Sequence, residues 1–516
     1  MTFPWLTALG LLPMLGAAVL MMVKGKQARG IGVAFALATM VFGIVVAVMI
    51  GGGADISEKL PWIKAFGAWW AMGPLDGLSL TMVLLVVILT PFVLLASWND
   101  VDLDDKWNSH VFFALVLALE SLSLFVFMAS DVLLFYLFFE ATLIPMYFLI
   151  GGFGQARRGY AAMKFLLFGL GGGLIMLASV IGLYVVSAQR GGTPSYLLSD
   201  LTALNLDGSV SRWLFLGFFI AFALKAPMVP FHTWLPDAAE EGTPGGATLL
   251  VGVLDKIGTF GMIRFCLELF PEASRWASPV ILILALISMI YGALAAVGQR
   301  NIMRLIAFTS ISHFGFMVIG IFSMTTQSLT GATFYMFNHA FSTAVLFLVA
   351  GFLVKRRGSA EIAAFGGVQK VAPVLAGVWL VGGLSSLALP GMSSFISEFM
   401  VIAGSFARHP WIAGISTIGM VLAALYILLM YQRTMTGPVT DQVARTFSVE
   451  AMTEAKGGTV DMSGREKLAI APLIALILVL GFFPKPMLDV IEPAAKQTMQ
   501  HVGLTDPEPK IAKGHN

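Results

Sequence analysis

The sequence predicts an all-α polytopic membrane protein with about 14 transmembrane helices. Two observations carry this prediction. Of the 516 residues, 58% are hydrophobic and only 12% are charged, whereas soluble domains carry about 25% charged residues. Apolar runs of about 20 residues, the length that crosses a bilayer, also recur from one end of the chain to the other. Together they exclude the soluble globular, disordered and fibrous classes.

The apolar runs are joined by mostly short connections. The first run has no basic segment before it, so we expect a membrane span there and not a cleaved signal peptide. The longest connection, 432–465, is charged and has no apolar periodicity, so we expect no soluble domain between spans. In order, the expected spans are 3–23, 31–53, 75–97, 111–128, 132–153, 160–187, 213–236, 244–268, 277–297, 302–323, 328–354, 372–404, 411–431 and 466–487.

The distribution of basic residues predicts the orientation. An N-terminus outside the membrane places the larger share of the 31 Lys and Arg residues in cytoplasmic connections, as the positive-inside rule requires. The acidic connection 98–110 runs against this bias. With an even number of spans, both termini are expected outside.

Two of the expected spans are broken by prolines. Pro227 and Pro230 interrupt one, and the pair Pro390-Gly391 interrupts another. Such breaks are tolerated in lipid only where the freed backbone groups meet protein or water. The breaks lie five helices apart, which predicts two inverted five-helix repeats, an arrangement typical of carriers; the alternative is two unrelated kinks. The resulting division is 1–110, 111–270, 271–432 and 433–516.

Ionisable residues within apolar spans carry the functional signal. Each costs at least about 2.5–3.5 kcal/mol at the bilayer centre, so such residues usually mark transport pathways. They are Glu120, Glu140, Lys164, Lys225, Asp255, Lys256, His313, His339 and Glu398.

Glu140 and Lys225 have the chemistry of a charge pair. Both lie in mid-span among aromatic and aliphatic residues, too deep to reach the interface. At about 6 Å and an effective dielectric constant near 20, their attraction is roughly 2.8 kcal/mol. That energy suffices to move the lysine between its charged and neutral forms. A structural ion pair that locks two helices is the alternative.

Lys256 occupies the middle of the eighth expected span, with Asp255 beside it. Adjacent helical residues point about 100° apart, so the two need not pair with each other. For Asp255, a relay and a helix-locking partner are both open. Glu120 and Lys164 carry weaker signals, each open as a supporting partner.

His313 and His339 lie in successive spans, and histidine titrates near physiological pH, which suits a proton relay. A hydrogen-bonded core histidine is the alternative for each. A bis-histidine haem site is a third possibility, disfavoured because membrane haem scaffolds usually repeat histidines within one helix. Glu398 follows the second break and offers an acidic group where the first break offers Lys225; helix capping is the alternative.

Other chemistry lacks its sequence signature. The single cysteine, Cys266, excludes a disulfide framework, a Cys-ligated iron–sulfur cluster and a structural zinc site. The net charge of +2 is too small to indicate a nucleic-acid-binding surface. The glycine-rich run 169–174 lies inside a span, where it predicts close helix packing and not a dinucleotide loop. No Walker, nucleophile-elbow or HExxH motif is present.

Three segments resemble a known family: SDVLLFYLFFEATLIPMYFLIGGFG, LKAPMVPFHTWLPDAAEEGTP and GMSSFISEFM. They are similar to the antiporter-like M subunits of respiratory complex I, the proton-translocating NADH–quinone oxidoreductase, over about 70–430. The wider family includes the L and N subunits, Mrp antiporters and membrane-bound hydrogenase subunits. Two features favour M: the chain ends soon after its last span, without the long lateral helix of L, and Glu398 stands where L and N typically carry lysine.

The resemblance implies a role for each matching residue. Glu140 and Lys225 correspond to a charge pair that modulates the proton site, and Lys256 to the lysine of a central axis. Glu398 corresponds to the terminal residue on the exit side. Asp255 stands where an apolar residue is expected, so the resemblance assigns it nothing.

The two histidines correspond to relay groups beside Lys256, so the proton pathway implied by the resemblance also contains His313 and His339. The implied activity is proton translocation driven by quinone reduction in partner subunits. The implied partners are neighbouring L and N subunits and a peripheral NADH-oxidising arm, in a bacterial plasma membrane. Flavin, iron–sulfur clusters and quinone are implied in those partners and not in this chain, which is expected to carry out no redox chemistry itself.

Two other functions stay open at this point. One is a subunit of an Mrp-type cation/proton antiporter or of a membrane-bound hydrogenase. The other is a solute permease that uses the broken helices as its substrate site. A permease requires a polar cavity at the breaks, whereas aliphatic residues surround them in this sequence.

Overall fold

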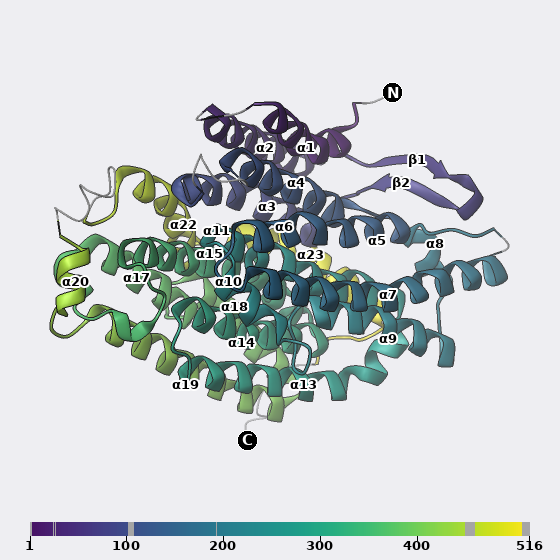
Figure 1. The fold of residues 1–516 in the computed structure, drawn as a ribbon. Coiled ribbons are helices and arrows are strands. Elements are labelled where there is room, and N and C mark those ends of the chain that lie inside the picture. The colour runs from purple at the N-terminus through teal and green to yellow at the C-terminus, as the bar shows by residue number, and fades with distance from the viewer. Residues whose placement is uncertain are drawn as a thin grey trace, which may run out of the picture.

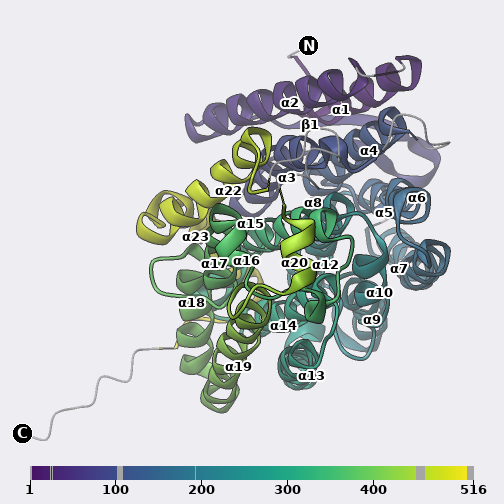
Figure 2. The ribbon, with the colours of Figure 1, turned by 60° about the vertical axis from the view of Figure 1, so that its left-hand side comes forward.

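The computed structural model is a bundle of long helices (Figure 1). It describes residues 3–23, 25, 27–101, 108–191, 193–448 and 460–507. Figure 1 shows the hairpin β1–β2 and helix α8 at one end of the bundle and α20 at the other. In Figure 2, α1 and α2 form one edge of the bundle, and α13 and α19 lie at the opposite edge.

The first half of the bundle is built as follows: α1 (Trp5–Met22), α2 (Gln27–Gly51), β1 (Glu58–Ile63), η1 (Lys64–Phe66), β2 (Ala68–Met72), α3 (Gly77–Ala96), η2 (Ser97–Asn99), α4 (Ser109–Met128), α5 (Val132–Ala141), α6 (Leu143–Phe153), α7 (Arg158–Gly191), α8 (Leu198–Ala203), α9 (Gly208–Lys225), α10 (Trp234–Glu241), α11 (Pro244–Leu249), η3 (Leu250–Leu254), α12 (Asp255–Gly261) and η4 (Met262–Leu267).

The second half follows: α13 (Pro271–Val297), α14 (Ile302–Phe322), α15 (Thr326–Arg357), η5 (Ile362–Ala364), α16 (Val368–Val371), α17 (Pro373–Ser386), α18 (Ser393–Arg408), α19 (Pro410–Met435), α20 (Asp441–Thr446), α22 (Gly464–Phe482) and α23 (Lys485–Val502). Among these elements, η3 and η4 are π-helical, and η1, η2 and η5 are 3₁₀-helical.

Eleven helices of the described chain are long and apolar enough to cross a membrane, or twelve if the bent pair α22–α23 counts as one span. This confirms an all-α multi-pass membrane protein. The expected spans 244–268 and 372–404 are divided into shorter helices and so do not count as whole spans. The number fourteen, the two inverted repeats and the division of the chain stay predictions.

Both predicted breaks are confirmed. Helix α9 ends at Lys225 and α10 begins at Trp234, with Pro227 and Pro230 between them. Helix α17 ends at Ser386, and α18 begins after Pro390-Gly391. The first break places Lys225 at the end of α9, and the second places Glu398 within the second turn of α18.

Two further interruptions were not predicted. One residue, Thr142, separates α5 from α6, three positions before Pro145, which lacks the N–H that the Ala141 carbonyl needs. The expected span 244–268 contains two π-helical segments on either side of α12. π-Helical segments bond backbone groups five residues apart and often mark functional sites.

Two short elements also escaped the sequence prediction. The strands β1 and β2 pair antiparallel in a hairpin where only a connection was expected. Helix α23 bends 73° away from α22 where a tail was expected. Both are too short or too polar to register as apolar runs. The expected connection 432–465 includes 449–459, which lie outside the described residues.

The central helices α14 and α15 are almost entirely enclosed by the rest of the bundle. Glycines let α13 approach α14 closely: a Cβ at Gly315 would meet the Ala285 carbonyl oxygen at 2.7 Å, and one at Gly292 would meet the Ser312 nitrogen at 2.7 Å. Close backbone approach through small residues is how helices pack where no water drives them together. It keeps α14, which carries His313, in a fixed position.

An ion-pair network holds α10, the helix after the first break, to its neighbours. Asp237 on α10 accepts from Lys164 on α7 at 2.6 Å and from Arg304 on α14 at 2.5 Å. Arg304 also contacts Glu240 at 2.9 Å. Lys164 is thus a member of this network and not an isolated charge in mid-span.

We predict that Asp237→Asn lowers the thermal stability of the protein more than Glu240→Gln does. Asp237 forms close ion pairs with two cations, and its side chain is 14% exposed. Glu240 forms one close ion pair, with Arg304, and lies 3.9 Å from Arg157. Breaking a partly buried pair leaves cations without a partner, at a cost between the values for exposed and fully buried pairs, about 2 kcal/mol. Thermal unfolding of the purified membrane complex measures both variants. Equal midpoints for Asp237→Asn and the wild type would contradict the assignment.

Candidate functional site

The candidate site is built around α12, the short helix between the two π-helical segments. Asp255 begins α12, and Lys256 follows it. Both side chains have an exposed fraction of 0%. A buried charge is tolerated only when polar groups surround it, so the contacts of Lys256 decide what the site can do.

Lys256 is bound by one backbone oxygen and one imidazole. Its Nζ atom donates to the Val251 carbonyl oxygen in η3 at 2.9 Å and lies 2.6 Å from Nδ1 of His339. It also lies 4.7 Å from the ring centroid of Phe314, within cation–π range. The predicted neighbours Lys256 and His339 are thus in direct contact, beside the packing of η3 on α15.

The chain of contacts that begins at Lys256 leads through His339 to His313. Its Nε2 atom lies 3.1 Å from the hydroxyl of Thr343, so both ring nitrogens of His339 are engaged. The rings of His339 and His313 are 5.0 Å apart, edge to face. With both of its nitrogens engaged, His339 has none free for a haem iron, which disfavours the bis-histidine site.

Two tyrosines extend this chain to Glu398. The hydroxyl of Tyr426 on α19 lies 3.0 Å from Nε2 of His313. The hydroxyl of Tyr335 on α15 donates to one carboxylate oxygen of Glu398, and the ring of Tyr335 lies 5.8 Å from that of His313. Glu398 is 1% exposed, and its second oxygen has no hydrogen-bond partner among the described residues.

Polar side chains of α15 hold the second break in place beside this chain. The amide of Asn338 donates to the Ser393 carbonyl oxygen at 3.1 Å and to the Ser397 hydroxyl at 2.8 Å. The hydroxyl of Ser342 contacts Ser385 on the far side of the break at 2.6 Å. These bonds fix the start of α18 and therefore the position of Glu398.

Lys225 and Glu140 lie on the other side of α12. Each acts electrostatically on the other, but they do not form an ion pair within 4 Å in the described structure. Lys225 donates to the Thr142 hydroxyl at 3.3 Å and lies 4.9 Å from the ring centroid of Phe139. The Glu140 carboxylate fills the space beside Gly173 on α7, where a Cβ atom would meet it at 1.8 Å.

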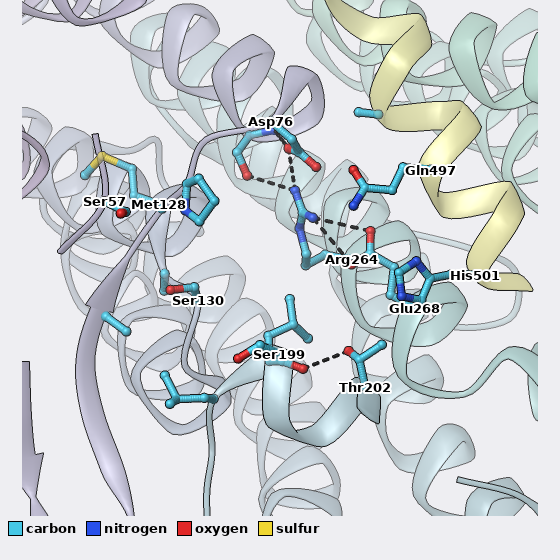
Figure 3. A pocket seen from close by; sticks show the side chains of 18 of the residues that line it. Ser57, Asp76, Met128, Ser130, Ser199, Thr202, Arg264, Glu268, Gln497 and His501 are labelled. Atoms are coloured by element: carbon cyan, nitrogen blue, oxygen red, sulfur yellow. Dashed lines mark hydrogen bonds and ion pairs between the residues drawn. The ribbon is translucent and has the colours of Figure 1, made fainter. Parts of the chain in front are cut away.

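Two cavities lie at opposite ends of the helical segment that carries Lys256. One, of about 520 Å³, is lined by Pro244 at the start of α11. The other, of about 740 Å³, is lined by Arg264 and Glu268 at the far end (Figure 3). The segment from Pro244 to Arg264 is about 30 Å long at 1.5 Å per residue, which matches the thickness of the hydrocarbon core.

Figure 3 shows the Arg264 side chain pointing between Asp76 and Glu268 in the larger cavity. Its guanidinium donates to Asp76 at 2.5 Å and to Glu268 at 3.3 Å. Thr498 on α23 donates to the same Glu268 carboxylate at 3.2 Å. These contacts join α3, η4 and α23 at one end of the bundle. Within the described ranges, no group of three or more His, Cys, Asp or Glu residues could hold a metal ion.

Comparison with known proteins identifies the family. The family model described as NADH:quinone oxidoreductase/Mrp antiporter, TM, matches residues 129–425. NADH-quinone oxidoreductase subunit M of Mycobacterium tuberculosis H37Rv is 48% identical, with 99% of this chain and 96% of the relative covered. The Rhodobacter capsulatus subunit M is 34% identical, with 96% of each covered. The chain belongs to the subunit M family of NADH-quinone oxidoreductases.

Solved structures share the fold of this chain. A chain of respiratory complex I from Thermus thermophilus with bound NADH is 31% identical, with a TM-score of 0.86 and coverage of 97% of this chain and 100% of that one. A chain of the Mrp complex from Dietzia sp. DQ12-45-1b has a TM-score of 0.84 at 21% identity, with the same coverage, and shares the fold. The family predicted from three sequence segments is confirmed.

Two residues of this site, Tyr335 and Tyr426, were missed by the sequence analysis. The sequence nevertheless contains a signal for each of them. Tyr335 precedes His339 by four residues and so lies on the same helix face, and both tyrosines carry a hydroxyl in spans otherwise rich in Phe and Leu. A buried tyrosine hydroxyl usually has a hydrogen-bond partner.

We predict that Tyr426→Phe slows proton pumping about fivefold while the complex assembles normally. The substitution keeps the ring and removes only the hydroxyl that contacts His313. Loss of one hydrogen bond costs about 1 kcal/mol, which is about fivefold in a rate constant. Proton uptake by inverted vesicles measures the effect. Tyr431→Phe, on the same helix and outside this chain of contacts, is the matched control, and equal pumping by the two variants would contradict a role for Tyr426.

Proposed function

We propose that this chain moves protons across the membrane as the M subunit of an NADH–quinone oxidoreductase. The pathway that we propose consists of Glu140, Lys225, Lys256, His313, His339 and Glu398. The observation that supports it most is the series of contacts from Lys256 through the two histidines and two tyrosines to Glu398.

The contacts suit protons because each member can gain or lose one. A proton held on Lys256 can pass to the Nδ1 atom of His339, which it touches. The centroids of the two histidine rings are 5.0 Å apart, edge to face, and no hydrogen bond joins these rings in the described structure, so we propose that a water molecule or a ring rotation completes that step. Tyr426 contacts His313 and Tyr335 contacts Glu398, and we propose that a water molecule or a ring rotation also completes the step between these two pairs.

Glu140 and Lys225 form the modulating end of the pathway in this proposal. Their electrostatic coupling without direct contact means that a small movement changes how strongly each stabilises the charge of the other. Moving one elementary charge against the membrane potential costs about 2.3 kcal/mol per 100 mV. An energy of this size therefore has to reach the pair from outside the chain.

We assign the source of that energy to quinone reduction in partner subunits. This chain is proposed to hold no redox centre, and flavin, iron–sulfur clusters and quinone are placed in the partners. The proposed partners are neighbouring L and N subunits and the peripheral NADH-oxidising arm. The proposed location is the bacterial plasma membrane with both termini outside.

The shared fold of the Dietzia Mrp complex makes a cation/proton antiporter the second candidate. The two functions differ in the partner subunits that bind this chain and in the reaction that drives transport. Purification in mild detergent followed by identification of the co-purifying subunits separates them. Flavin and iron–sulfur subunits support the first function, whereas sodium-dependent exchange without NADH supports the second.

We predict that Glu398→Gln strongly reduces pumping with near-normal assembly, and that Glu398→Asp retains more of it. Glutamine preserves the size of the side chain and its bond to Tyr335 but cannot release a proton. Aspartate keeps the carboxyl at a shorter reach. Proton uptake in inverted vesicles compares both with the wild type. Wild-type pumping in Glu398→Gln would leave Glu398 a structural residue.

We also predict that Lys256→Met reduces pumping more than His313→Gln does. Water can bridge one missing relay group, but it cannot replace the stored charge of Lys256. NADH oxidation with an artificial acceptor checks assembly in each variant, and vesicle proton uptake gives the ranking. An equal and complete loss in both assembled variants would contradict it.

A further inference from the structure

Asp255 is a buried carboxylate for which neither the family resemblance nor the proposed pathway has a role. Its exposed fraction is 0%. Neither of its carboxylate oxygens has a hydrogen-bond partner in the described part of the chain. A carboxylate in such a place is expensive, so its presence requires an explanation.

The charges around Asp255 come from both halves of the pathway. Lys256 and Lys225 both act on it electrostatically. Glu140 acts on Lys225 from the other side. Asp255 is therefore the carboxylate that the two lysines share.

The backbone places Asp255 on the side of α12 that faces Lys225. At Gly258 a Cβ atom would meet the backbone nitrogen of Ala226 at 2.5 Å, so this face of α12 lies against the end of α9, where Lys225 is the last residue. At about 100° per residue, Asp255 lies about 60° from Gly258 around the helix, whereas Lys256 lies about 160° from it. Lys256 accordingly contacts His339 on the opposite side.

We propose that Asp255 is a proton-carrying residue that links Lys225 to Lys256. The proposal rests on the proposed function, because it adds a member to that pathway. It also explains how the modulating pair Glu140–Lys225 communicates with the chain that begins at Lys256, since no direct contact between the two lysines connects them in the described structure.

The transfer conserves protons and charge. The Lys225 ammonium gives its proton to the Asp255 carboxylate, which leaves a neutral amine and a neutral carboxylic acid. The acid then gives the proton to a neutral Lys256 amine, which restores the carboxylate and forms the Lys256 ammonium. Neither lysine forms an ion pair or a hydrogen bond with the Asp255 carboxylate in the described structure, so a water molecule or a side-chain rotation completes each step, and no other reactant is needed.

A fixed counterion is the alternative role. As a counterion, Asp255 would keep its negative charge throughout and would only stabilise the charged lysines. The two roles differ in one respect: a proton carrier is protonated during turnover, and a counterion is not. The experiment therefore has to report on the carboxyl group itself as well as on pumping.

Glu120 on α4 provides a matched control. It is 3% exposed, and both of its carboxylate oxygens lack a partner among the described residues, as in Asp255. Among the described residues, no charged neighbour acts on its carboxyl group, which is simply buried. Removing this carboxyl tests whether a buried acid matters for pumping when no lysine is near.

The test uses the whole complex in inverted vesicles, with NADH oxidation by an artificial acceptor as the measure of assembly. Asp255→Asn and Asp255→Leu are expected to lower proton uptake per assembled complex about tenfold, and Asp255→Glu to retain about half of it. Glu120→Gln is expected to pump as the wild type does. The leucine variant covers the case in which the asparagine variant fails to assemble, because leucine places no unpaired amide in this apolar surrounding.

Infrared difference spectra of the complex with and without NADH supply the second readout. A carboxylic-acid C=O band that Asp255→Asn or Asp255→Leu removes and Asp255→Glu shifts supports the proton carrier. Reduced pumping with an unchanged set of carboxylic-acid bands overturns it in favour of a counterion. Wild-type pumping in an assembled Asp255→Asn or Asp255→Leu variant overturns both roles.

Parallel measurements separate this proposal from the function on which it rests. If Lys256→Met and Glu398→Gln lose pumping while Asp255→Asn keeps it, the role of Asp255 is wrong and the proposed pathway stands. If Lys256→Met and Glu398→Gln both pump normally, the proposed pathway itself fails.

Discussion

The contact between Lys256 and His339 requires a lysine side chain to be buried at the centre of the bundle, and the surrounding structure makes this possible. This contact joins α12 to α15 in the enclosed centre of the bundle, where neither side chain reaches solvent. A lysine there needs polar partners that a regular apolar helix does not offer. The π-helical segment η3 brings the Val251 carbonyl oxygen to the lysine as its second partner. An irregular stretch of backbone thus makes a buried cation possible.

The same rule explains why each interruption of a helix lies beside an ionisable residue. Lys225 ends α9, Glu398 lies five residues after the start of α18, and Glu140 lies two residues before the interruption at Thr142. In lipid, a broken helix is tolerated only where protein or water satisfies the freed groups. Polar side chains such as Thr142 provide that satisfaction and at the same time bind the charge, as the bond from Lys225 shows.

Hydropathy predicted most of the spans, because burial in lipid leaves a long apolar run in the sequence. It also predicted the proline breaks and the six pathway candidates, since each is costly in an apolar run. It could not predict η3 and η4, because π-helical turns have no residue signature comparable to proline. It also missed Tyr335 and Tyr426, because their hydrogen bonds to Glu398 and His313 depend on which helices lie side by side. The direct pairing of Lys256 with His339 likewise depends on the packing of η3 on α15.

The arrangement of space in the bundle favours protons over larger cargo. The two cavities lie at the ends of the segment that carries Lys256, about 30 Å apart along the helix. Between them, the described interior around Lys256 is filled by the rings of Phe314, His339 and His313. A hydrated ion or a solute needs an open passage of its own size, whereas a proton needs only a series of groups that can exchange it. Side chains that would block a permease are therefore compatible with the proposed proton relay.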